Sequence, residues 1–354
     1  MPAIQDSRLD WTLRPSDLSA AFCVLGFRLP EDFMYENLRL DVSLLDFEKS
    51  VAPLQQKAAK LIESGAEENK IRDAVEALEK ALKKTYGSLN HWQMTQVARH
   101  PQRPYGLDYV ERLFTDFVEL HGDRNFRDDP STVCGIAEFD GQSVVVVAQQ
   151  KGRNTEENIK RNFGMPQPEG YRKALRFFEF AQKFKKPVIT FIDTPGAFPG
   201  LEGEERSQGE AIARNLKVMA GLEVPVVSVV IGEGGSGGAL GVGVANYVMM
   251  LAHSVYSVIS PESCASILWR NADEKVVAAS ALKNDAETAL RFGIIDEIVP
   301  EPIGGAHRNW DAAAAQVGKS LRRVLPGLMA QKSEKLVEDR IAKFAAMGVT
   351  ARVD

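Results

Sequence analysis

The chain has 354 residues and a formal net charge of −5 at pH 7, and 44% of its residues are hydrophobic. This length is sufficient for a packed core, and the composition is typical of a soluble globular protein. The mildly acidic balance gives no support to nucleic-acid binding, and no apolar run approaches the roughly 20 residues that a membrane helix needs.

Cysteine usage is typical of a reducing compartment. The three cysteines, Cys23, Cys134 and Cys264, lie far apart, and no C-x-x-C pair occurs. We therefore expect neither a zinc ribbon nor a redox dithiol in this chain. The N-terminus has no secretory signal pattern, so a cytoplasmic protein is predicted. No metal site is predicted either, because the histidines at positions 100, 121, 253 and 307 are isolated in the sequence.

The N-terminal part divides into two predicted regions. Residues 1–41 lack hydrophobic periodicity, so we interpret them as a poorly ordered extension or as residues upstream of the natural start, for which Met34 is a candidate. From residue 44 onward, apolar residues recur at helical spacing on both sides of a helix stop signal at residues 64–65. This pattern predicts an antiparallel helical hairpin within residues 42–97.

Residues 98–305 alternate between predicted strands and helices. A proline-containing linker at 98–105 precedes buried strands at 144–148, 188–192, 224–231, 247–251 and 256–259. Helices are predicted at 170–184, 205–219, 237–245 and 261–269, and a C-terminal helical arm at 306–354. Continuous apolar strands separated by helices predict an α/β fold with a mostly parallel sheet that is covered on both faces.

Two glycine-containing loops follow predicted strands and enter predicted helices. The first spans residues 193–200 (DTPGAFPG), and the second spans residues 232–243 (GEGGSGGALGVG). Ligands bind at the carboxyl ends of strands in such sheets, and bare N–H groups at a helix start favour a negatively charged oxygen. The loops therefore predict a site for a phosphate or for an oxyanion formed during catalysis.

Short patterns in the second loop leave two other functions open. Residues 232–237 match the dinucleotide-binding pattern G-x-G-x-x-G, but no acidic residue occupies the matching region at 254–260. Residues 234–238 match G-x-S-x-G, and Ser236, Asp296 and His307 follow in the order of a serine hydrolase triad. A serine hydrolase or peptidase that uses Ser236 is therefore the alternative function.

Several long motifs resemble the carboxyltransferase alpha-subunit family of bacterial acetyl-CoA carboxylases. They are the two glycine loops together with residues 161–175 (RNFGMPQPEGYRKAL), 257–269 (SVISPESCASILW) and 302–308 (PIGGAHR). The resemblance runs from about residue 44 to the C-terminus. It implies a crotonase-like core of repeated β-β-α units with N- and C-terminal helical arms.

The resemblance also implies the reaction and the partners. A carboxyl group would pass from carboxybiotin, on a biotin carboxyl carrier protein, to acetyl-CoA, forming malonyl-CoA in the first committed step of fatty acid biosynthesis. The family assembles as an α2β2 heterotetramer whose beta subunit carries zinc, within an ATP-dependent complex that includes biotin carboxylase. No cofactor would be bound covalently in this chain.

The site residues follow from the loops and the resemblance together. In crotonase-like enzymes an oxyanion hole takes one donor from each of two loops, so we predict backbone N–H donors at Gly196, Ala197, Gly237 and Gly238. The sequence offers no convincing side-chain base, which agrees with a biotin nitrogen as the proton acceptor. The predicted carboxybiotin-binding residues are Gly164, Met165, Pro166, Gly234, Gly235, Ser236, Arg161 and Arg172.

Overall fold

The computed structural model describes residues 38–348. The chain divides into two units, Met1–Leu38 and Arg39–Asp354, and the description below concerns the second unit. Apart from residues 38–41, the predicted N-terminal extension at residues 1–41 lies outside the described residues.

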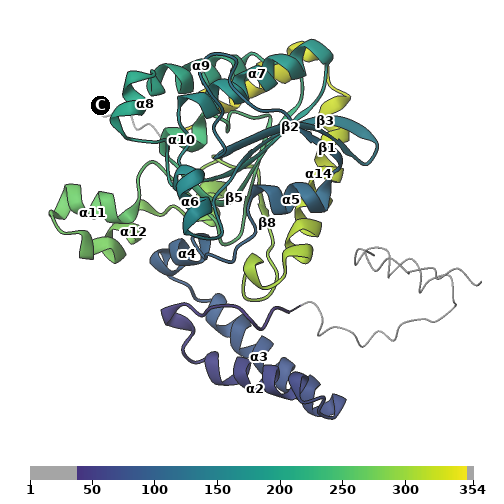
Figure 1. Cartoon of the computed structure of the whole chain (residues 1–354), viewed down its shortest axis with the longest axis vertical. Coiled ribbons are helices and arrows are strands. Elements are labelled where there is room, and N and C mark those ends of the chain that lie inside the picture. Colours follow the sequence, from purple (N-terminus) through teal and green to yellow (C-terminus); the bar gives the residue numbers. More distant parts are fainter. Residues whose placement is uncertain (1–37, 349–354) are drawn as a thin grey trace, which may run out of the picture. The chain divides into compact units, whose positions relative to one another are not determined.

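An eight-stranded sheet forms the centre of the second unit (Figure 1). The strand order is β1-β2-β3-β4-β5-β6-β8, and β7 pairs with β5. The pairs β1–β2 and β2–β3 are antiparallel and the others are parallel, which confirms the predicted mostly parallel sheet. The strands are β1 Thr115–Glu119, β2 Thr132–Phe139, β3 Gln142–Gln149, β4 Val188–Thr194, β5 Val226–Gly235, β6 Tyr247–Leu251, β7 Val255–Ser257 and β8 Glu297–Val299.

Alternating side chains of the central strands enter two hydrophobic cores, one on each face of the sheet. Val145 and Val147 of β3 pack with α7 (Pro168–Phe184) in one core. Val144 and Val146 pack with α14 (Trp310–Met329) in the other. Because successive side chains of a strand point in opposite directions, a continuous apolar strand needs cover on both faces. The part of the predicted C-terminal arm that forms α14 thus packs directly on the sheet.

Two helices form a hairpin in the N-terminal part of the described chain. It consists of α2 (Ala52–Glu63) and α3 (Glu68–Tyr86), which pack against each other (Figure 1). Gly65 between them has φ 60°, a value that glycine adopts without strain. Leu78 and Leu82, one turn apart on α3, are fully buried, as the helical spacing of apolar residues requires.

The three predicted elements whose bounds differ most from the structure lie next to the two glycine loops. The helix predicted at 205–219 is α9 (Gln208–Ala220), which is separated from the short α8 (Leu201–Glu205) by Ser207 at φ 65°. The strand predicted at 224–231 continues to Gly235, and the helix predicted at 237–245 is only α10 (Ser236–Leu240).

The other described helices cover the sheet or extend from it. They are α4 His91–Ala98, α5 Gly106–Leu113, α6 Thr155–Lys160, α11 Pro261–Trp269, α12 Lys275–Leu282, α13 Ala286–Arg291 and α15 Ser333–Ala345. Four 3-10 turns lie at Asp46–Glu48, Asn162–Gly164, Ala272–Glu274 and Ala306–Arg308. Within residues 38–348, no helix is long and apolar enough to cross a membrane.

Candidate active site

The two glycine loops leave neighbouring parallel strands, β4 and β5, and lie against each other. A Cβ atom at Gly238 would lie 2.5 Å from the backbone nitrogen of Ala197, and one at Gly235 would lie 2.2 Å from the carbonyl oxygen of Pro195. Only glycine permits so close an approach. The structure therefore brings Ala197 and Gly238 together at the carboxyl ends of parallel strands, where ligands bind in open α/β sheets.

The four predicted N–H donors differ in how they are engaged. Gly196, at φ 152°, donates its N–H to Thr194 Oγ1 over 3.1 Å. The N–H of Ala197 has no acceptor among residues 38–348. Gly237 and Gly238 lie in the first turn of α10, where N–H groups lack partners within the helix. The free donors are thus Ala197 on the first loop and Gly237 or Gly238 on the second.

Gly234 and Gly235 lie within β5 rather than in a loop. Gly234 pairs with Tyr256 of β7, and a Cβ atom there would lie 2.6 Å from the tyrosine ring. Packing against neighbouring chain segments therefore explains these glycines. Because Gly232 and Gly234 are both strand residues, the pattern at 232–237 does not form a phosphate-binding turn, and the dinucleotide-binding interpretation is wrong.

The residues of the alternative serine hydrolase triad are not assembled. His307 is fully buried, and its Nε2 lies 3.4 Å from Tyr86 Oη. Asp296 Oδ2 accepts the N–H of Val248 over 2.7 Å. Ser236 is exposed at φ 52°, and no hydrogen bond within the described chain joins it to either residue. The predicted triad is therefore wrong.

The third predicted loop, residues 164–166, lies beside the first glycine loop. Thr194 Oγ1 lies 2.6 Å from the carbonyl oxygen of Gly164, and the Phe198 N–H donates to the Pro166 carbonyl over 3.0 Å. Gly164 and Pro166 are buried, whereas Met165 between them is partly exposed. Three loops that are distant in the sequence therefore share one end of the sheet.

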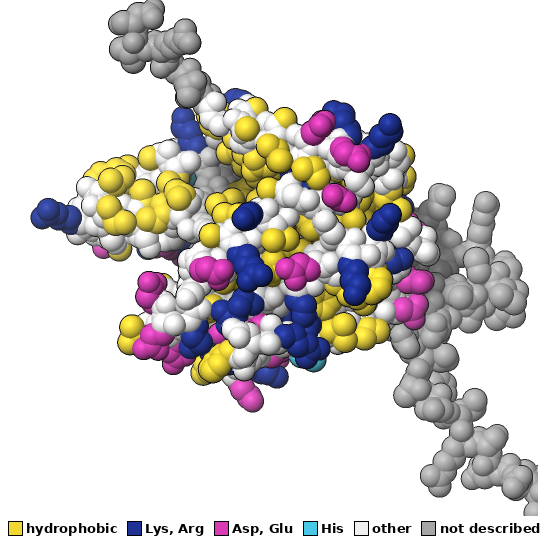
Figure 2. All heavy atoms as spheres, turned by 90° about the horizontal axis from the view of Figure 1, so that it is seen from above, with side chains coloured by type: hydrophobic (Ala, Val, Ile, Leu, Met, Phe, Trp, Pro, Cys, Tyr) yellow, Lys and Arg dark blue, Asp and Glu magenta, His cyan; other side chains and the backbone are white. Residues whose placement is uncertain are grey.

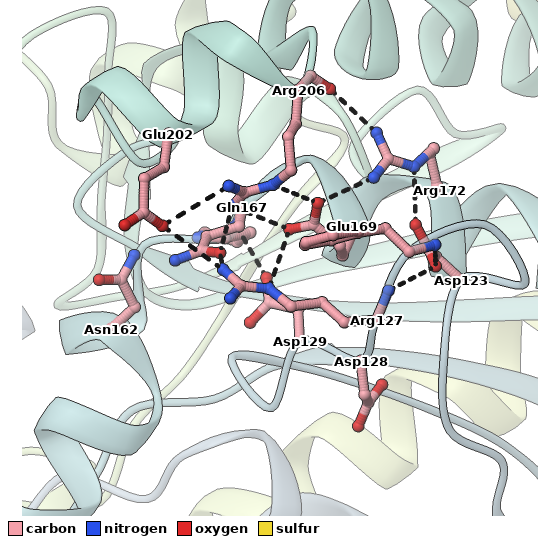
Figure 3. A network of polar contacts seen from close by, with 12 residues as sticks. Asp123, Arg127, Asp128, Asp129, Asn162, Gln167, Glu169, Arg172, Glu202 and Arg206 are labelled. Atoms are coloured by element: carbon pink, nitrogen blue, oxygen red, sulfur yellow. Dashed lines mark hydrogen bonds and ion pairs between the residues drawn. The ribbon is translucent and has the colours of Figure 1, made fainter.

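The two predicted arginines have protein partners. Arg172 donates from Nε to Asp123 over 2.8 Å, from Nη2 to Glu169 over 2.9 Å and from Nη1 to the Arg206 carbonyl over 3.1 Å (Figure 3). Arg161 Nη1 donates to the Pro130 carbonyl over 2.6 Å. Arg172 thus uses all three guanidinium nitrogens within the protein, and this favours a role in holding α7 and its neighbouring loops in place.

Sequence reasoning missed Gln149, the last residue of β3. Its fully buried side chain donates from Nε2 to the Gly238 carbonyl over 2.8 Å, and its Oε1 accepts the Asp193 N–H over 3.1 Å. Tyr171 of α7 also donates to the Gly238 carbonyl, over 3.2 Å. The signal in the sequence was a polar residue directly after an apolar strand, at the carboxyl end of a predicted parallel sheet.

Lys151 and Arg99 were also missed, and with Asp193 and Glu233 they form a strand-end charge cluster beneath the glycine loops. Lys151 Nζ lies 2.7 Å from Asp193 Oδ1 and 2.9 Å from Glu233 Oε2. Arg99 Nε lies 2.6 Å from Glu233 Oε1. Burial raises the pKa of Glu233, but the charges of Lys151 and Arg99 overcome this effect and lower the pKa to about 2.

A mainly apolar cavity of about 270 Å³ opens beside the second glycine loop. Its lining includes Ser236 and Gly237 of α10, Tyr256 of β7 and Phe344 of α15. The arrangement joins free backbone N–H donors to an apolar space. Such donors stabilise negative charge that develops on an oxygen atom, and exclusion of water strengthens the effect.

Within residues 38–348, no group of three or more His, Cys, Asp and Glu side chains could hold a metal ion. Cys134 and Cys264 are both free and buried.

Comparison with known protein families identifies the relatives of this chain. A sequence model described as acetyl co-enzyme A carboxylase carboxyltransferase-like matches residues 44–348. The acetyl-coenzyme A carboxylase carboxyl transferase subunit alpha of Syntrophotalea carbinolica is 53% identical over 308 residues, which cover 86% of this chain and 97% of that protein. The protein of the same name from Alcanivorax borkumensis is 49% identical, covering 87% of this chain and 97% of its own length.

Solved structures share the fold at low sequence identity. A Pseudomonas malonate decarboxylase hetero-tetramer in complex with coenzyme A contains a chain with a TM-score of 0.54 and 17% identity, and the match covers 68% of this chain and 95% of that one. The transcarboxylase 12S structure gives a TM-score of 0.51 at 18% identity, covering 72% of this chain and 44% of that one. The predicted crotonase-like fold is confirmed.

Proposed function

Because the chain belongs to the acetyl co-enzyme A carboxylase carboxyltransferase family, we propose that it is the alpha subunit of a biotin-dependent carboxyltransferase that forms malonyl-CoA from acetyl-CoA. This reaction is the first committed step of fatty acid biosynthesis. The single observation in the structure that supports it most is the close approach of Ala197 and Gly238, which brings backbone N–H donors from the two glycine loops near each other.

The proposed chemistry needs such donors twice. The carboxyl group leaves carboxybiotin when a carbon–nitrogen bond breaks, and the electron pair moves toward the ureido oxygen. The released nitrogen takes a proton from the acetyl methyl group, and the resulting enolate forms a carbon–carbon bond with carbon dioxide. Negative charge therefore grows on the ureido oxygen and on the thioester oxygen, and preorganised N–H groups stabilise such charge in the transition state.

We assign the donor roles in this chain to Ala197 and to Gly237 or Gly238. The N–H of Gly196 is engaged by Thr194, so we give Gly196 the role of shaping the loop. Gly164, Met165, Pro166 and Ser236 are proposed to line the carboxybiotin side of the site. Arg161, Arg172, Gly234 and Gly235 are proposed to support that side through their packing and protein contacts.

The proposal includes partner chains. We propose an α2β2 heterotetramer in which a zinc-carrying beta subunit supplies most of the acetyl-CoA site. We also propose that a biotin carboxyl carrier protein, whose biotin is carboxylated by biotin carboxylase, delivers the carboxyl group to this complex. Exposed apolar side chains on α11 and α12 support an association with another chain. Figure 2 shows hydrophobic atoms gathered there, and they include Ile267, Leu268, Trp269, Val276 and Val277.

Co-expression tests the function directly. We would produce the chain with a zinc-ribbon beta subunit encoded in the same genome, purify the complex, and measure malonyl-CoA decarboxylation with free biotin as the acceptor. The expected result is biotin-dependent formation of acetyl-CoA by the complex. Absence of activity with every such partner, although a complex forms, would contradict the proposal.

Two glycine-to-valine substitutions, one in the second glycine loop and one outside it, test the two-loop oxyanion hole. In Gly238→Val the side chain would push against the Ala197 backbone, so we expect kcat to fall by about 100-fold or more, as when an oxyanion donor is lost. Gly209→Val is the control, since a Cβ atom there meets nothing within 4 Å. The control should keep activity and both variants should bind the beta subunit. Equal activity of the two variants would remove the glycine loops from the mechanism.

A further inference from the structure

Gln149 connects the two glycine loops through the two ends of one side-chain amide. The side chain leaves the end of β3, is 0% exposed, and reaches the backbone at the end of β4 and in the first turn of α10. The orientation of the amide follows from its partners, because an N–H group faces one end and a carbonyl oxygen faces the other. A buried polar group with two such partners is held in one position.

The two bonds fix the parts of the proposed oxyanion hole relative to each other. Asp193 lies four residues before Ala197 and belongs to β4, whereas Gly238 is itself in the second loop. The Asp193–Gln149 bond holds the end of the strand that leads into the first loop, and the Gln149–Gly238 bond holds the first turn of α10. The geometry of catalytic donors must hold within about half an ångström, so a bridge between them affects the reaction.

We propose that Gln149 is a positioning residue for carboxyl transfer, in which its amide sets the distance between the donors of the two loops. The inference rests on the proposed function, because it assumes that Ala197 and Gly238 lie at the reacting oxygen. Tyr171 supports the same bridge from α7, since its hydroxyl donates to the same Gly238 carbonyl.

The requirement for a donor at this position can be tested by titration. In Gln149→Glu, one carboxyl oxygen still accepts the Asp193 N–H, but the other faces the Gly238 carbonyl and can bond to it only while protonated. Burial favours the neutral carboxyl and raises its pKa. The variant therefore regains the missing hydrogen bond at low pH and loses it at high pH, where two oxygen atoms repel each other.

The charged and titratable groups around the amide come from several elements. They are Lys151 beyond β3, Asp193 of β4, Glu233 of β5 and Tyr171 of α7. Lys151 is already paired with both Asp193 and Glu233, and burial raises the pKa of Tyr171. The new carboxyl is therefore the group expected to titrate near neutral pH in the variant but not in the wild type.

The experiment compares kcat and KM of the wild-type complex with those of Gln149→Glu and Gln149→Met from about pH 6 to about pH 9. We expect Gln149→Met to lower kcat by about 10- to 100-fold at every pH, with KM changed less than about threefold. Gln149→Glu should approach the wild type at the low end and the methionine variant at the high end. A merely structural role would change stability without this pH-dependent ratio of kcat values.

The outcomes separate this inference from the proposed function. If the wild-type complex itself transfers no carboxyl group, the proposed function fails. If the wild type is active and Gln149→Met keeps its kcat, or if Gln149→Glu follows the methionine variant at every pH, the positioning role is overturned. Should the Gln149 variants fail to fold, Tyr171→Phe removes the second donor to the Gly238 carbonyl, and we expect kcat to fall by about two- to fivefold. A wild-type kcat in that variant would then count against the bridge.

Discussion

The strand-end charge cluster and a second buried cluster, at the junction of the N-terminal hairpin with the core, differ in how they hold charge. Under the glycine loops, Lys151 and Arg99 are paired with Asp193 and Glu233, so each buried carboxylate touches a cation. These side chains stay ionised although they are buried, because the opposite charge of each partner offsets the lost solvation.

The junction cluster depends on neutral groups as well as charges, and consists of Glu48, Tyr86, His100, His307 and Arg308. Glu48 and Arg308 are both fully buried and lie 2.9 Å apart. The rings of His100 and His307 stack with their centroids 4.0 Å apart, and the Tyr86 hydroxyl donates to Glu48 over 3.2 Å. Two imidazole rings in contact in a buried place are stable together only while they are neutral.

The difference predicts opposite behaviour toward acid. Burial lowers the pKa of His100, and burial together with the charges of His100 and Arg308 lowers the pKa of His307 well below its usual range. Glu233 has its pKa lowered to about 2, so its contribution to stability is complete above about pH 4.5 and is lost as the pH falls from about 4.5 toward about 2. Paired charges thus hold the site over a wide pH range, whereas the neutral histidines make the attachment of the hairpin acid-sensitive.

Removing the Lys151 charge should have the largest effect on stability and activity, because it leaves two buried carboxylates without their shared cation. In Lys151→Met, the Asp193 and Glu233 carboxylates lose their shared cation, and we expect the free energy of unfolding to fall by about 3–5 kcal/mol and carboxyl transfer to be lost. Chemical denaturation and the transfer assay would measure the two effects. Lys57→Met, at an exposed position on α2, is the matched control and should change stability by less than about 0.5 kcal/mol. Equal stability of the two variants would show that the cluster does not hold the site.

The contrast between the clusters also shows what the sequence could reveal. Apolar strands such as residues 144–148 and the glycine loops behind them could be predicted, because local patterns determine them. The buried partners could not. In the sequence, Lys151 only begins a basic segment, with no sign of its partners, and the parallel pairing of β3, β4 and β5 brings it to Asp193 and Glu233.

The glycines show the same limit within the site itself. From the sequence, the glycines of the second loop are expected to leave backbone N–H groups bare for a negatively charged ligand. At Gly235 and Gly238 the close neighbours are the Pro195 carbonyl and the Ala197 nitrogen, which belong to the other loop. Glycine-rich composition therefore predicts a candidate site at these loops, whereas the reason for each glycine depends on the distance between two strand ends.

A smaller effect is expected at the junction from the loss of one hydroxyl group. Tyr86→Phe removes the donor to Glu48 and the contact with His307, but it leaves the Glu48–Arg308 ion pair in place. We expect the hairpin to be destabilised by about 1–3 kcal/mol. Hydrogen exchange should quicken in α2 and α3 while the amides of β4 and β5 stay protected, and transfer activity should fall less than in Lys151→Met. Faster exchange in β4 and β5 alone would contradict the separation of the two clusters.

Acidification of the unmodified protein should give the smallest and most selective change. Below about pH 6.5, His100 and His307 bind protons in the unfolded state but stay neutral in the folded state, because their pKa values are lowered there. The folding stability of the junction therefore decreases as the pH falls. Between about pH 6.5 and about pH 4.5 Glu233 of the strand-end charge cluster keeps its charge, because its pKa is lowered to about 2. We therefore expect hydrogen exchange in α2 and α3, corrected for the intrinsic pH dependence of exchange, to increase several-fold on going from about pH 7 to about pH 5, with little change in β4 and β5. In His307→Gln the increase should shrink, because one of the two titrating rings is gone. An unchanged pH response in that variant would mean that groups other than the stacked histidines make the hairpin acid-sensitive.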